Sequence, residues 1–413
     1  MKILHFSLGC WPETLGTSRR LSQLLRGDGN THYFVTPGAG GDGTGEDWRR
    51  HDNFLVKSVA GVRVPELPVV SRHVRASLNG RAMARAFPPT VPDLVHAHTP
   101  LECALAGRRS ARLLGVPLLY EIHTPYADEV GQRRRPGIPA GWYLPAKRLA
   151  RAREADVARS ADTVVVQTGI LGRRIAELFR LDEARVAVVP NGIDGRLFDP
   201  EPWTGRRNEI RRERGWTGKR IVLYSGYLDW INGVDFLLEA GNTLSAATRR
   251  NARIVLAGDG PLAEAAQRRA ATDPGLYEYL GRVEAPSMPE LYAGADIFVI
   301  PRPDTPAGRN LIPIKLLEAM AMEKAVLASD LDAIREALGE DGCGLRFRPG
   351  DREDFRQRLE SLVERFDDMG DLGKNARGRA LTAYGWERSR KLLADIYRNL
   401  GRTDSSTDRT EPS

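Results

Sequence analysis

The sequence predicts two α/β domains, each built on a doubly wound parallel sheet. Short aliphatic runs alternate with helix-like segments along the chain, which is typical of parallel sheets with helices on both faces. A polar stretch rich in Pro, Gly and Arg interrupts this alternation near the middle. The length of 413 residues also suits two domains, at roughly 100–200 residues each.

The first half contains six predicted strands, which are short aliphatic or β-branched runs. They are Ile3–Phe6, Tyr33–Val35, Leu94–Ala97, Pro117–Ile122, Thr163–Gln167 and Val186–Val189. One helix between them has clear end signals. Thr99 is the expected N-cap, Pro100 the first helical residue, and Glu102 lies at the capping-box position. Gly115 is expected to end this helix.

The second half repeats the pattern after a polar stretch, Asp199–Lys219, which we expect to be an interdomain linker with one short charged helix. The predicted strands are Ile221–Ser225, Arg253–Ala257, Tyr277–Leu280, Ile297–Ile300, Ala325–Ala328 and Leu345–Phe347. Predicted helices include Gly233–Ala240, Pro313–Met322 and Trp386–Leu400. The tail from Arg402 is polar and is expected to be disordered.

Composition limits the compartment and the partners. No run approaches the ~20 apolar residues of a membrane span, and the first residues lack the features of a secretory signal. We therefore expect a cytoplasmic protein, with Cys10, Cys103 and Cys343 as reduced thiols. The net charge of +7 permits nucleic acid, anionic lipid or phosphorylated small molecules as partners. Because the arginines are spread along the chain, we expect no nucleic-acid partner.

Ligands of doubly wound sheets bind beyond the carboxyl ends of the strands, so the loops after strands are the candidate sites. After the first strand, Gly16 precedes a helix whose N-terminus can face an anion. Trp11 in the same loop is either a stacking platform or a packing residue. His98 and His123 each follow a predicted strand and are expected at the mouth of the same crevice.

Small or flexible residues end four strands of the second half: Gly226, Gly258, Gly281 and, after Ile300, a loop rich in Pro and Gly. The next helix carries Lys315 and Glu318. Together these features fit a nucleotide diphosphate. Backbone N–H groups and a helix N-terminus suit its phosphates, and a carboxylate suits its ribose hydroxyls.

An ordered series of motifs resembles the retaining glycosyltransferases of family 4, which have the GT-B fold, over nearly the whole chain. The motifs are Val189–Asp194 with Phe198, Val255–Pro261, Leu280–Val283, Met288–Asp296, Leu317–Ala321 followed by Lys324–Ser329, and Trp386–Leu400. The resemblance implies two Rossmann-like domains facing a central cleft. Residues 1–198 with the returning helix 386–401 would bind the acceptor, residues 199–385 the donor, and residues 402–413 would form the tail.

The resemblance also implies site residues. The candidate catalytic residues are His123, beside the transferred sugar, Asn310 and Lys315. The candidate donor-binding residues are Gly16, Gly226, Tyr227, Asn232, Gly258, Val283, Arg302, Arg309, Leu311, Ile312 and Glu318. Glu318 would bind the donor ribose and Val283 would contact the base. The candidate acceptor-side residues are Trp11, Glu13, His98 and Tyr126.

Three positions depart from the family pattern. Asn310 replaces the first of two paired glutamates, Tyr227 replaces an arginine, and Asn232 replaces a lysine. The two lost cations normally balance the diphosphate. We hypothesise that Lys315, Arg302 or Arg309 supplies the missing charge, which makes the chain a divergent branch of the family.

The expected reaction is transfer of a hexose or N-acetylhexosamine from a UDP- or GDP-sugar to a hydroxyl of a glycan, lipid or small natural product, with retention. No cofactor or metal is expected, because no D-x-D motif lies in a suitable loop. The alternatives are a sugar-nucleotide epimerase or phosphorylase-like enzyme, and a non-catalytic member that binds nucleotide or membrane. Gln132–Arg135 and Trp142–Arg153 combine basic and aromatic residues, so they are either a peripheral contact with anionic lipid at the inner membrane face or a solvated helix.

Overall fold

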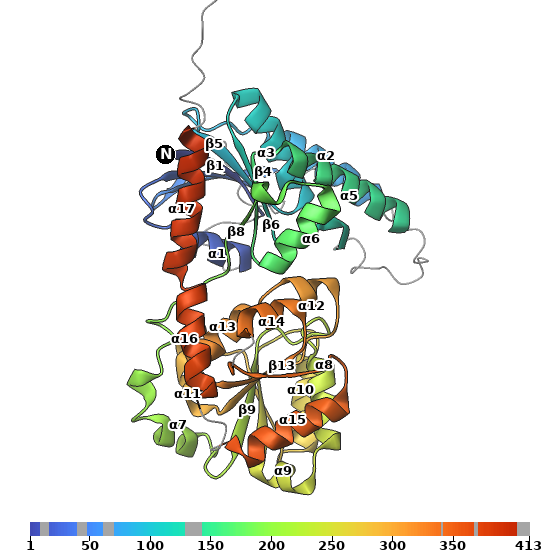
Figure 1. The fold of residues 1–413 in the computed structure, drawn as a ribbon, viewed down its shortest axis with the longest axis vertical. Coiled ribbons are helices and arrows are strands. Elements are labelled where there is room, and N and C mark those ends of the chain that lie inside the picture. The colour runs from blue at the N-terminus through green and yellow to red at the C-terminus, as the bar shows by residue number, and fades with distance from the viewer. Residues whose placement is uncertain are drawn as a thin grey trace, which may run out of the picture. The chain divides into compact units, whose positions relative to one another are not determined.

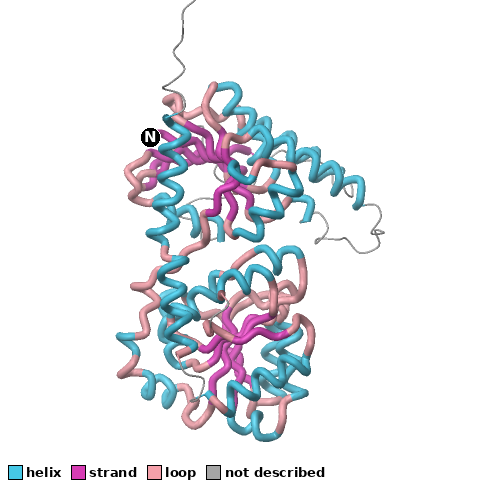
Figure 2. Tube along the Cα trace, in the orientation of Figure 1, coloured by secondary structure: helices cyan, strands magenta, loops and turns pink. Residues whose placement is uncertain are grey.

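The computed structural model describes residues 1–8, 16–38, 48–60, 70–128, 143–339, 342–366 and 371–402 (Figure 1). The chain divides into two compact units: Met1–Pro190 with Glu387–Ser413, and Asn191–Trp386. Each unit contains a sheet with helices on both faces (Figure 2). The predicted fold class of two parallel-sheet α/β domains is therefore confirmed.

The described residues of the first unit form an eight-stranded sheet in the order β3-β4-β2-β1-β5-β6-β7-β8. Its strands are β1 (Lys2–Phe6), β2 (Thr31–Gly38), β3 (Arg49–His51), β4 (Phe54–Ala60), β5 (Leu94–His98), β6 (Leu118–Ile122), β7 (Thr163–Val166) and β8 (Val186–Val188). All neighbours are parallel except β3 and β4. These two strands were not predicted, because they lie at one side of the sheet, where little of each strand is buried and the apolar pattern is weak.

The helices of the first unit are α1 (Gly16–Leu25), α2 (Val70–Met83), α3 (Leu101–Leu114), α5 (Tyr143–Ser160), α6 (Gly169–Phe179) and α17 (Trp386–Arg402). Helix α3 ends as predicted, at Gly115 with φ 67°. Its predicted start is wrong, because Pro100 is the N-cap and no side chain caps the helix. The Thr99 hydroxyl instead lies 3.4 Å from the backbone nitrogen of His123 and so supports the neighbouring loop.

The second unit has an all-parallel sheet of six strands in its described residues, in the order β11-β10-β9-β12-β13-β14. Its strands are β9 (Arg220–Ser225), β10 (Ala252–Ala257), β11 (Tyr277–Gly281), β12 (Ile297–Ile300), β13 (Ala325–Ser329) and β14 (Leu345–Phe347). Each coincides with a predicted strand to within one residue at either end. The fully buried side chains of β9, β10, β12 and β13 account for their continuous aliphatic sequences.

The helices of the second unit are α7 (Arg207–Glu213), α8 (Val234–Ala240), α9 (Ala246–Asn251), α10 (Ala263–Thr272), α11 (Met288–Gly294), α12 (Pro306–Asn310), α13 (Ile314–Ala321), α14 (Asp332–Leu338), α15 (Arg352–Glu364) and α16 (Leu372–Tyr384). Cys103 in the first unit and Cys343 in the second are free and buried, and Cys10 lies outside the described residues. Across the described residues, no helix combines the length and the apolar content needed to cross a membrane.

The stretch Asp199–Lys219 is part of the second unit and is not a linker. Trp216 is fully buried in the core of that unit. The guanidinium groups of Arg207 and Arg211 both donate to the buried carboxylate of Asp296, over 2.6 and 2.9 Å. The sequence analysis missed these contacts, because the stretch Asp199–Lys219 is polar in composition and its partners are distant in the sequence. The division of the chain accordingly falls after Pro190.

We expect Asp296→Ala to lower the free energy of unfolding by about 3–5 kcal/mol, because it leaves the partly buried Arg207 and Arg211 without their carboxylate. Urea denaturation measures the change. Asp330→Ala is the control, since Asp330 and its two ion-pair partners, Arg335 and Arg346, are all partly exposed and each such pair contributes about 0–1 kcal/mol. Equal losses in the two variants would contradict the importance of the Asp296 pair.

Candidate functional site

Each sheet reverses its strand order once, and a ligand crevice is expected beside the reversal. In the second unit the order runs from β9 to β11 on one side and from β12 to β14 on the other, so the reversal lies between β9 and β12. In the first unit it lies between β1 and β5. The segments that follow these strands are therefore the candidate sites.

Glycines allow the backbone segments to meet at the reversal of the second unit. A Cβ on Gly258, which follows β10, would lie 1.8 Å from the carbonyl oxygen of Gly226, which follows β9. A Cβ on Gly233, which has φ +75°, would lie 1.8 Å from the carbonyl oxygen of Pro301 at the end of β12. Side chains at either position would force these segments apart, so the glycines determine the shape of the site.

Arg302 links the loops after β9 and β12. Its guanidinium donates to the side-chain oxygen of Asn232 over 3.2 Å and to the backbone oxygen of Leu311 over 3.3 Å. The Asn232 amide in turn donates to the Asp229 carboxylate over 2.8 Å and to the Tyr227 carbonyl over 3.2 Å. The structure thus brings together four predicted donor-binding residues through Asp229, which the sequence did not single out.

The charge of Arg302 is not matched by an ion pair. Among the described residues, no carboxylate lies within the 4.0 Å ion-pair distance of its guanidinium. Burial lowers the pKa of Arg302, although Tyr224 and Asp229 act in the opposite direction. A partly buried cation without an ion pair at a strand reversal is suited to an anionic ligand.

Glu318 and Lys315 lie one turn apart on α13 and form an ion pair of 3.0 Å. The same carboxylate oxygen of Glu318 accepts from the Tyr292 hydroxyl over 3.1 Å. That hydroxyl also lies 3.1 Å from the Ser225 hydroxyl, at the end of β9. Tyr292 and Ser225 therefore hold in place the carboxylate of Glu318, the residue predicted to bind the donor ribose. Both were missed, although Tyr292 lies within the motif Met288–Asp296.

Three other predicted donor-binding residues and the predicted catalytic residue Asn310 have partners within the protein. Arg309 pairs with Asp304 at the surface, and 56% of its side chain is exposed. Asn310 is buried, and its amide donates to the Pro306 carbonyl within α12 over 2.6 Å. Ile312 belongs to the core, and Val283 packs against it. In this structure the side chains of Arg309 and Asn310 thus stabilise their own loop.

A polar cluster covers one face of the first sheet. The side chains of His5, His32, His96, His98 and Glu121 occupy alternate strand positions on neighbouring strands and are fully buried. Such alternation usually indicates a face exposed to water. Here α17 covers it, and the Tyr397 hydroxyl lies 2.8 Å from His96 Nδ1.

Glu121 is the centre of this cluster. Its Oε1 accepts from Arg20 Nε over 2.7 Å and lies 3.0 Å from His123 Nε2. Its Oε2 lies 3.3 Å from His96 Nε2 and 3.4 Å from His98 Nδ1. Burial alone would raise the pKa of Glu121, but Arg20 and the three histidines hold it well below its usual range. The carboxylate therefore stays charged and orients His123, whose side chain is 17% exposed.

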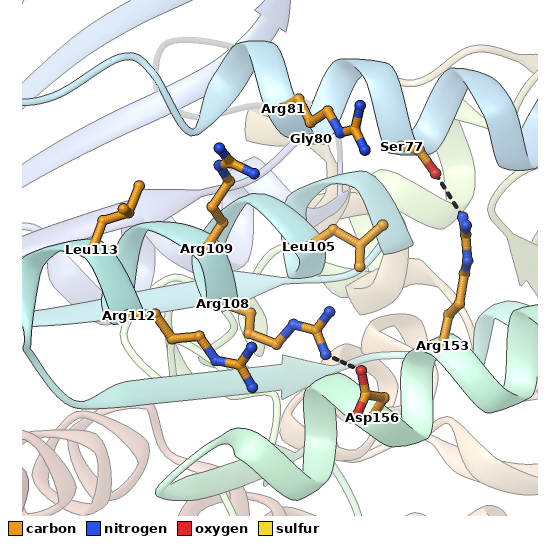
Figure 3. A pocket seen from close by; sticks show the side chains of 10 residues that line it. All are labelled: Ser77, Gly80, Arg81, Leu105, Arg108, Arg109, Arg112, Leu113, Arg153 and Asp156. Atoms are coloured by element: carbon orange, nitrogen blue, oxygen red, sulfur yellow. Dashed lines mark hydrogen bonds and ion pairs between the residues drawn. The ribbon is translucent and has the colours of Figure 1, made fainter.

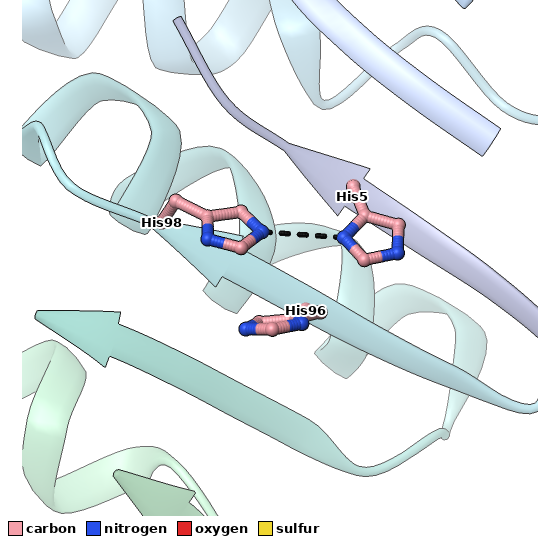
Figure 4. Close-up of side chains that lie close together, drawn as sticks. All are labelled: His5, His96 and His98. Carbon is pink, nitrogen blue, oxygen red and sulfur yellow. Dashed lines mark hydrogen bonds between the residues drawn. The ribbon is translucent and has the colours of Figure 1, made fainter. Parts of the chain in front are cut away.

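The histidine cluster contains the described groups that could hold a metal ion, namely His5, His96 and His98, and also His98, Glu121 and His123. Figure 4 shows the His5 and His98 rings on neighbouring strands, with His5 Nδ1 and His98 Nε2 joined at 3.2 Å. His5 Nε2 lies 2.9 Å from His32 Nδ1. The ring nitrogens of His5, His96 and His98 thus all have polar neighbours, which are other imidazole rings, the Tyr397 hydroxyl or the Glu121 carboxylate.

Glu121 and Arg20 were missed by the sequence analysis. The available signal was a glutamate within the otherwise buried strand Leu118–Ile122, since a carboxylate is almost never fully buried without partners. Of the predicted residues, Gly16 begins α1, while Trp11 and Glu13 lie outside the described residues. The ring of Tyr126 is buried in a small apolar cluster, so in this structure it belongs to the core.

Two family models match the chain. One, described as Glycosyltransferase Family 4, matches residues 17–196, and the other, Glycosyl transferases group 1, matches residues 219–365. A D-inositol 3-phosphate glycosyltransferase from Nocardiopsis dassonvillei is 24% identical over 83% of this chain and 81% of the relative. The sulfoquinovosyl transferase SQD2 of Arabidopsis thaliana is also 24% identical, over 71% of this chain, which spans about half (54%) of that relative.

Among solved structures, Anabaena HepE in complex with UDP has a TM-score of 0.71 at 15% identity. The match covers 97% of this chain and 100% of HepE. HepE has also been solved in complex with UDP-glucose.

The buried histidines predict acid sensitivity. Burial lowers the pKa of His5, of His98 and of His96, the last to about 3. In the unfolded chain the pKa of each of these histidines is about 6.5. Below that pH the unfolded state therefore binds more protons than the folded state. Stability therefore falls as the pH drops from 6.5 toward 5, by about 1.4 kcal/mol per pH unit for each histidine.

Urea unfolding of the first unit between pH 7 and pH 5 measures this effect. Glu121 does not contribute in that range, because its lowered pKa makes stability fall only below its unfolded value of 4.5. His51→Gln is the control, since His51 lies on β3 outside the cluster and its removal should leave the slope unchanged. A pH-independent free energy of unfolding would refute the prediction.

Proposed function

Because the chain belongs to glycosyltransferase family 4 and has the GT-B fold, we propose that it transfers a sugar from a UDP- or GDP-sugar to an acceptor hydroxyl with retention. The observation that carries this proposal is the arrangement at the β9/β12 reversal. Arg302, Lys315 and Glu318 there combine two cations with a carboxylate held in place by its neighbours. The UDP and UDP-glucose complexes of HepE support a nucleotide donor.

Arg302 and Lys315 are proposed to balance the diphosphate in place of the cations lost at Tyr227 and Asn232. Arg302 supports this role because its guanidinium contacts Asn232 itself, the position of one lost cation. Lys315 lies beside Glu318 on the next helix. Arg309 is the weaker candidate, because its ion pair with Asp304 is exposed at the surface, whereas Lys315 pairs with the buried Glu318 carboxylate itself. This replacement is the basis for placing the chain in a divergent branch of the family.

Glu318 is proposed to accept hydrogen bonds from the donor ribose. An ionised carboxylate accepts hydrogen bonds from hydroxyl groups, and the contacts with Tyr292 and Lys315 hold this one in a fixed position. His123 is proposed to contact a hydroxyl of the transferred sugar. Its Nε2 faces Glu121, which orients the ring and leaves Nδ1 for the ligand.

The proposed chemical step is attack of the acceptor oxygen on the anomeric carbon from the side of the leaving group. The carbon–acceptor oxygen bond forms as the carbon–phosphate oxygen bond breaks, and the acceptor proton passes to the departing phosphate. Positioning and electrostatic stabilisation of the diphosphate then supply most of the catalysis. Since Arg302 and Lys315 provide the positive charge, we propose that the reaction requires no metal. The acceptor is a hydroxyl of a glycan, a lipid or a small natural product.

A thermal-shift screen with UDP-, GDP-, ADP- and TDP-sugars tests donor binding. A donor at about 100 times its Kd should add about 2.7 kcal/mol of stability, which raises Tm. Arg302→Ala and Lys315→Ala should each weaken donor binding about tenfold or more, because each removes a charge-assisted hydrogen bond to phosphate. Arg309→Ala is the matched control and should bind as the wild type does. If all three variants bind the donor as tightly as the wild type, the proposal that Arg302 and Lys315 replace the two lost cations is refuted.

NMR of the product tests the stereochemical course. We expect the anomeric configuration of the donor to be retained and turnover to persist in EDTA. An inverted product would refute retention, and loss of turnover in EDTA would refute metal independence. Incubation with donor alone is the control for reaction class, because an epimerase converts the donor, whereas a transferase at most hydrolyses it slowly.

A further inference from the structure

A basic pocket lies on the helical layer of the first unit, formed by α2, α3 and α5 (Figure 3). Its volume is about 620 Å³, which is enough for a small organic phosphate. The lining residues are Ser77, Gly80, Arg81, Leu105, Arg108, Arg109, Arg112, Leu113, Arg153 and Asp156. We call it the arginine pocket, because five of these residues are arginine and only one is acidic.

Of the five guanidinium groups, only that of Arg108 forms an ion pair with a described residue. Arg108 pairs with Asp156, and Arg153 donates to the Ser77 hydroxyl over 2.6 Å. Within the described part of the chain, no carboxylate lies within 4.0 Å of Arg81, Arg109 or Arg112, all of which are exposed. Grouping like charges around one depression is unfavourable without a counter-ion, so the pocket favours an anion.

The floor of the pocket is held by close packing of its helices. A Cβ on Gly80 of α2 would lie 3.0 Å from the Glu102 carbonyl oxygen and 3.3 Å from the Leu105 Cβ of α3. The absence of a side chain at Gly80 therefore lets α2 and α3 approach closely. As a result, Arg109 and Arg112 of α3 line the same pocket as Arg81 of α2 (Figure 3).

The arginine pocket is separate from the proposed catalytic residues of the first unit. Helix α3 starts directly after β5, so its first turn lies at the carboxyl edge of the sheet, where His123 follows β6. The pocket arginines of α3 occupy its second half, toward the opposite edge. A ligand in the pocket therefore does not require the donor-binding or catalytic machinery.

We propose that the arginine pocket binds a phosphate group, carried either by a soluble phosphorylated compound or by an anionic lipid headgroup. Several guanidinium groups suit a phosphate, which accepts paired hydrogen bonds and carries about −1.5 to −2 charges as a monoester. None of the described lining residues is an aromatic residue on which a nucleobase could stack. This inference is independent of the proposed sugar transfer.

The test compares two triple variants of the full chain that remove equal charge. R81A/R109A/R112A removes the three exposed arginines of the pocket, and R49A/R85A/R173A removes three exposed arginines of the same unit outside both the lining and the segment Trp142–Arg153. Calorimetry measures the binding of inorganic phosphate and pyrophosphate in the Arg302→Ala background, which weakens the proposed donor site. Flotation at low salt measures binding to phosphatidylglycerol vesicles, with phosphatidylcholine vesicles as reference. Equal Tm values of the two triple variants show that both are folded.

We expect R81A/R109A/R112A to bind phosphate about tenfold more weakly or worse, since each lost charge-assisted contact contributes at about that level. The control triple variant is expected to bind phosphate as the wild type does. A selective loss for soluble phosphates alone supports a soluble ligand. A selective loss of vesicle binding supports a lipid headgroup. The proposal is overturned if neither form of binding depends on the pocket, or if the two triple variants lose binding equally, which indicates general charge attraction.

Discussion

The ends of the parallel strands meet at one edge of each sheet, and the strand order reverses once along that edge. The arrangement of both candidate sites depends on this constraint. In the second unit, the segments that follow β9 and β12 meet at the reversal, where Arg302 contacts Asn232. In the first unit, the same geometry places His98 at the end of β5 and His123 just after β6.

The two candidate sites deal with buried charge in different ways. In the first, Glu121 is fully buried, and Arg20 and three histidines surround it, so its charge is balanced within the protein. In the second, Arg302 contacts only neutral oxygen atoms of Asn232 and Leu311. A balanced carboxylate can position a neighbouring side chain, whereas a cation bound only by neutral acceptors remains able to bind an anion. The same contrast separates Arg108, which is paired with Asp156, from the exposed arginines of the arginine pocket.

Much of the fold and part of the site could be predicted. The strands of the second unit have continuous aliphatic sequences because both faces are covered, and glycines mark the strand ends where backbones meet. Glu318 was predicted through its motif, and the structure places it buried on α13, where Tyr292 and Lys315 contact its carboxylate. The stretch Asp199–Lys219 was misassigned, because its polar composition concealed the buried Trp216 and the two arginines bound to Asp296.

By itself, the sequence determined the alternation of strands and helices, the loops that follow the strands and the family motifs, because all of these are local patterns. Only the tertiary structure decided which side chains meet. Arg302 contacts Asn232 across 70 residues, Arg20 contacts Glu121 across 101 residues, and Tyr397 contacts His96 across 301 residues. Such contacts depend on how strands are ordered and helices packed, so neither composition nor spacing specifies them. For this reason the glycines at the β9/β12 reversal could be named in advance, whereas the partners of Arg302 and Glu318 could not.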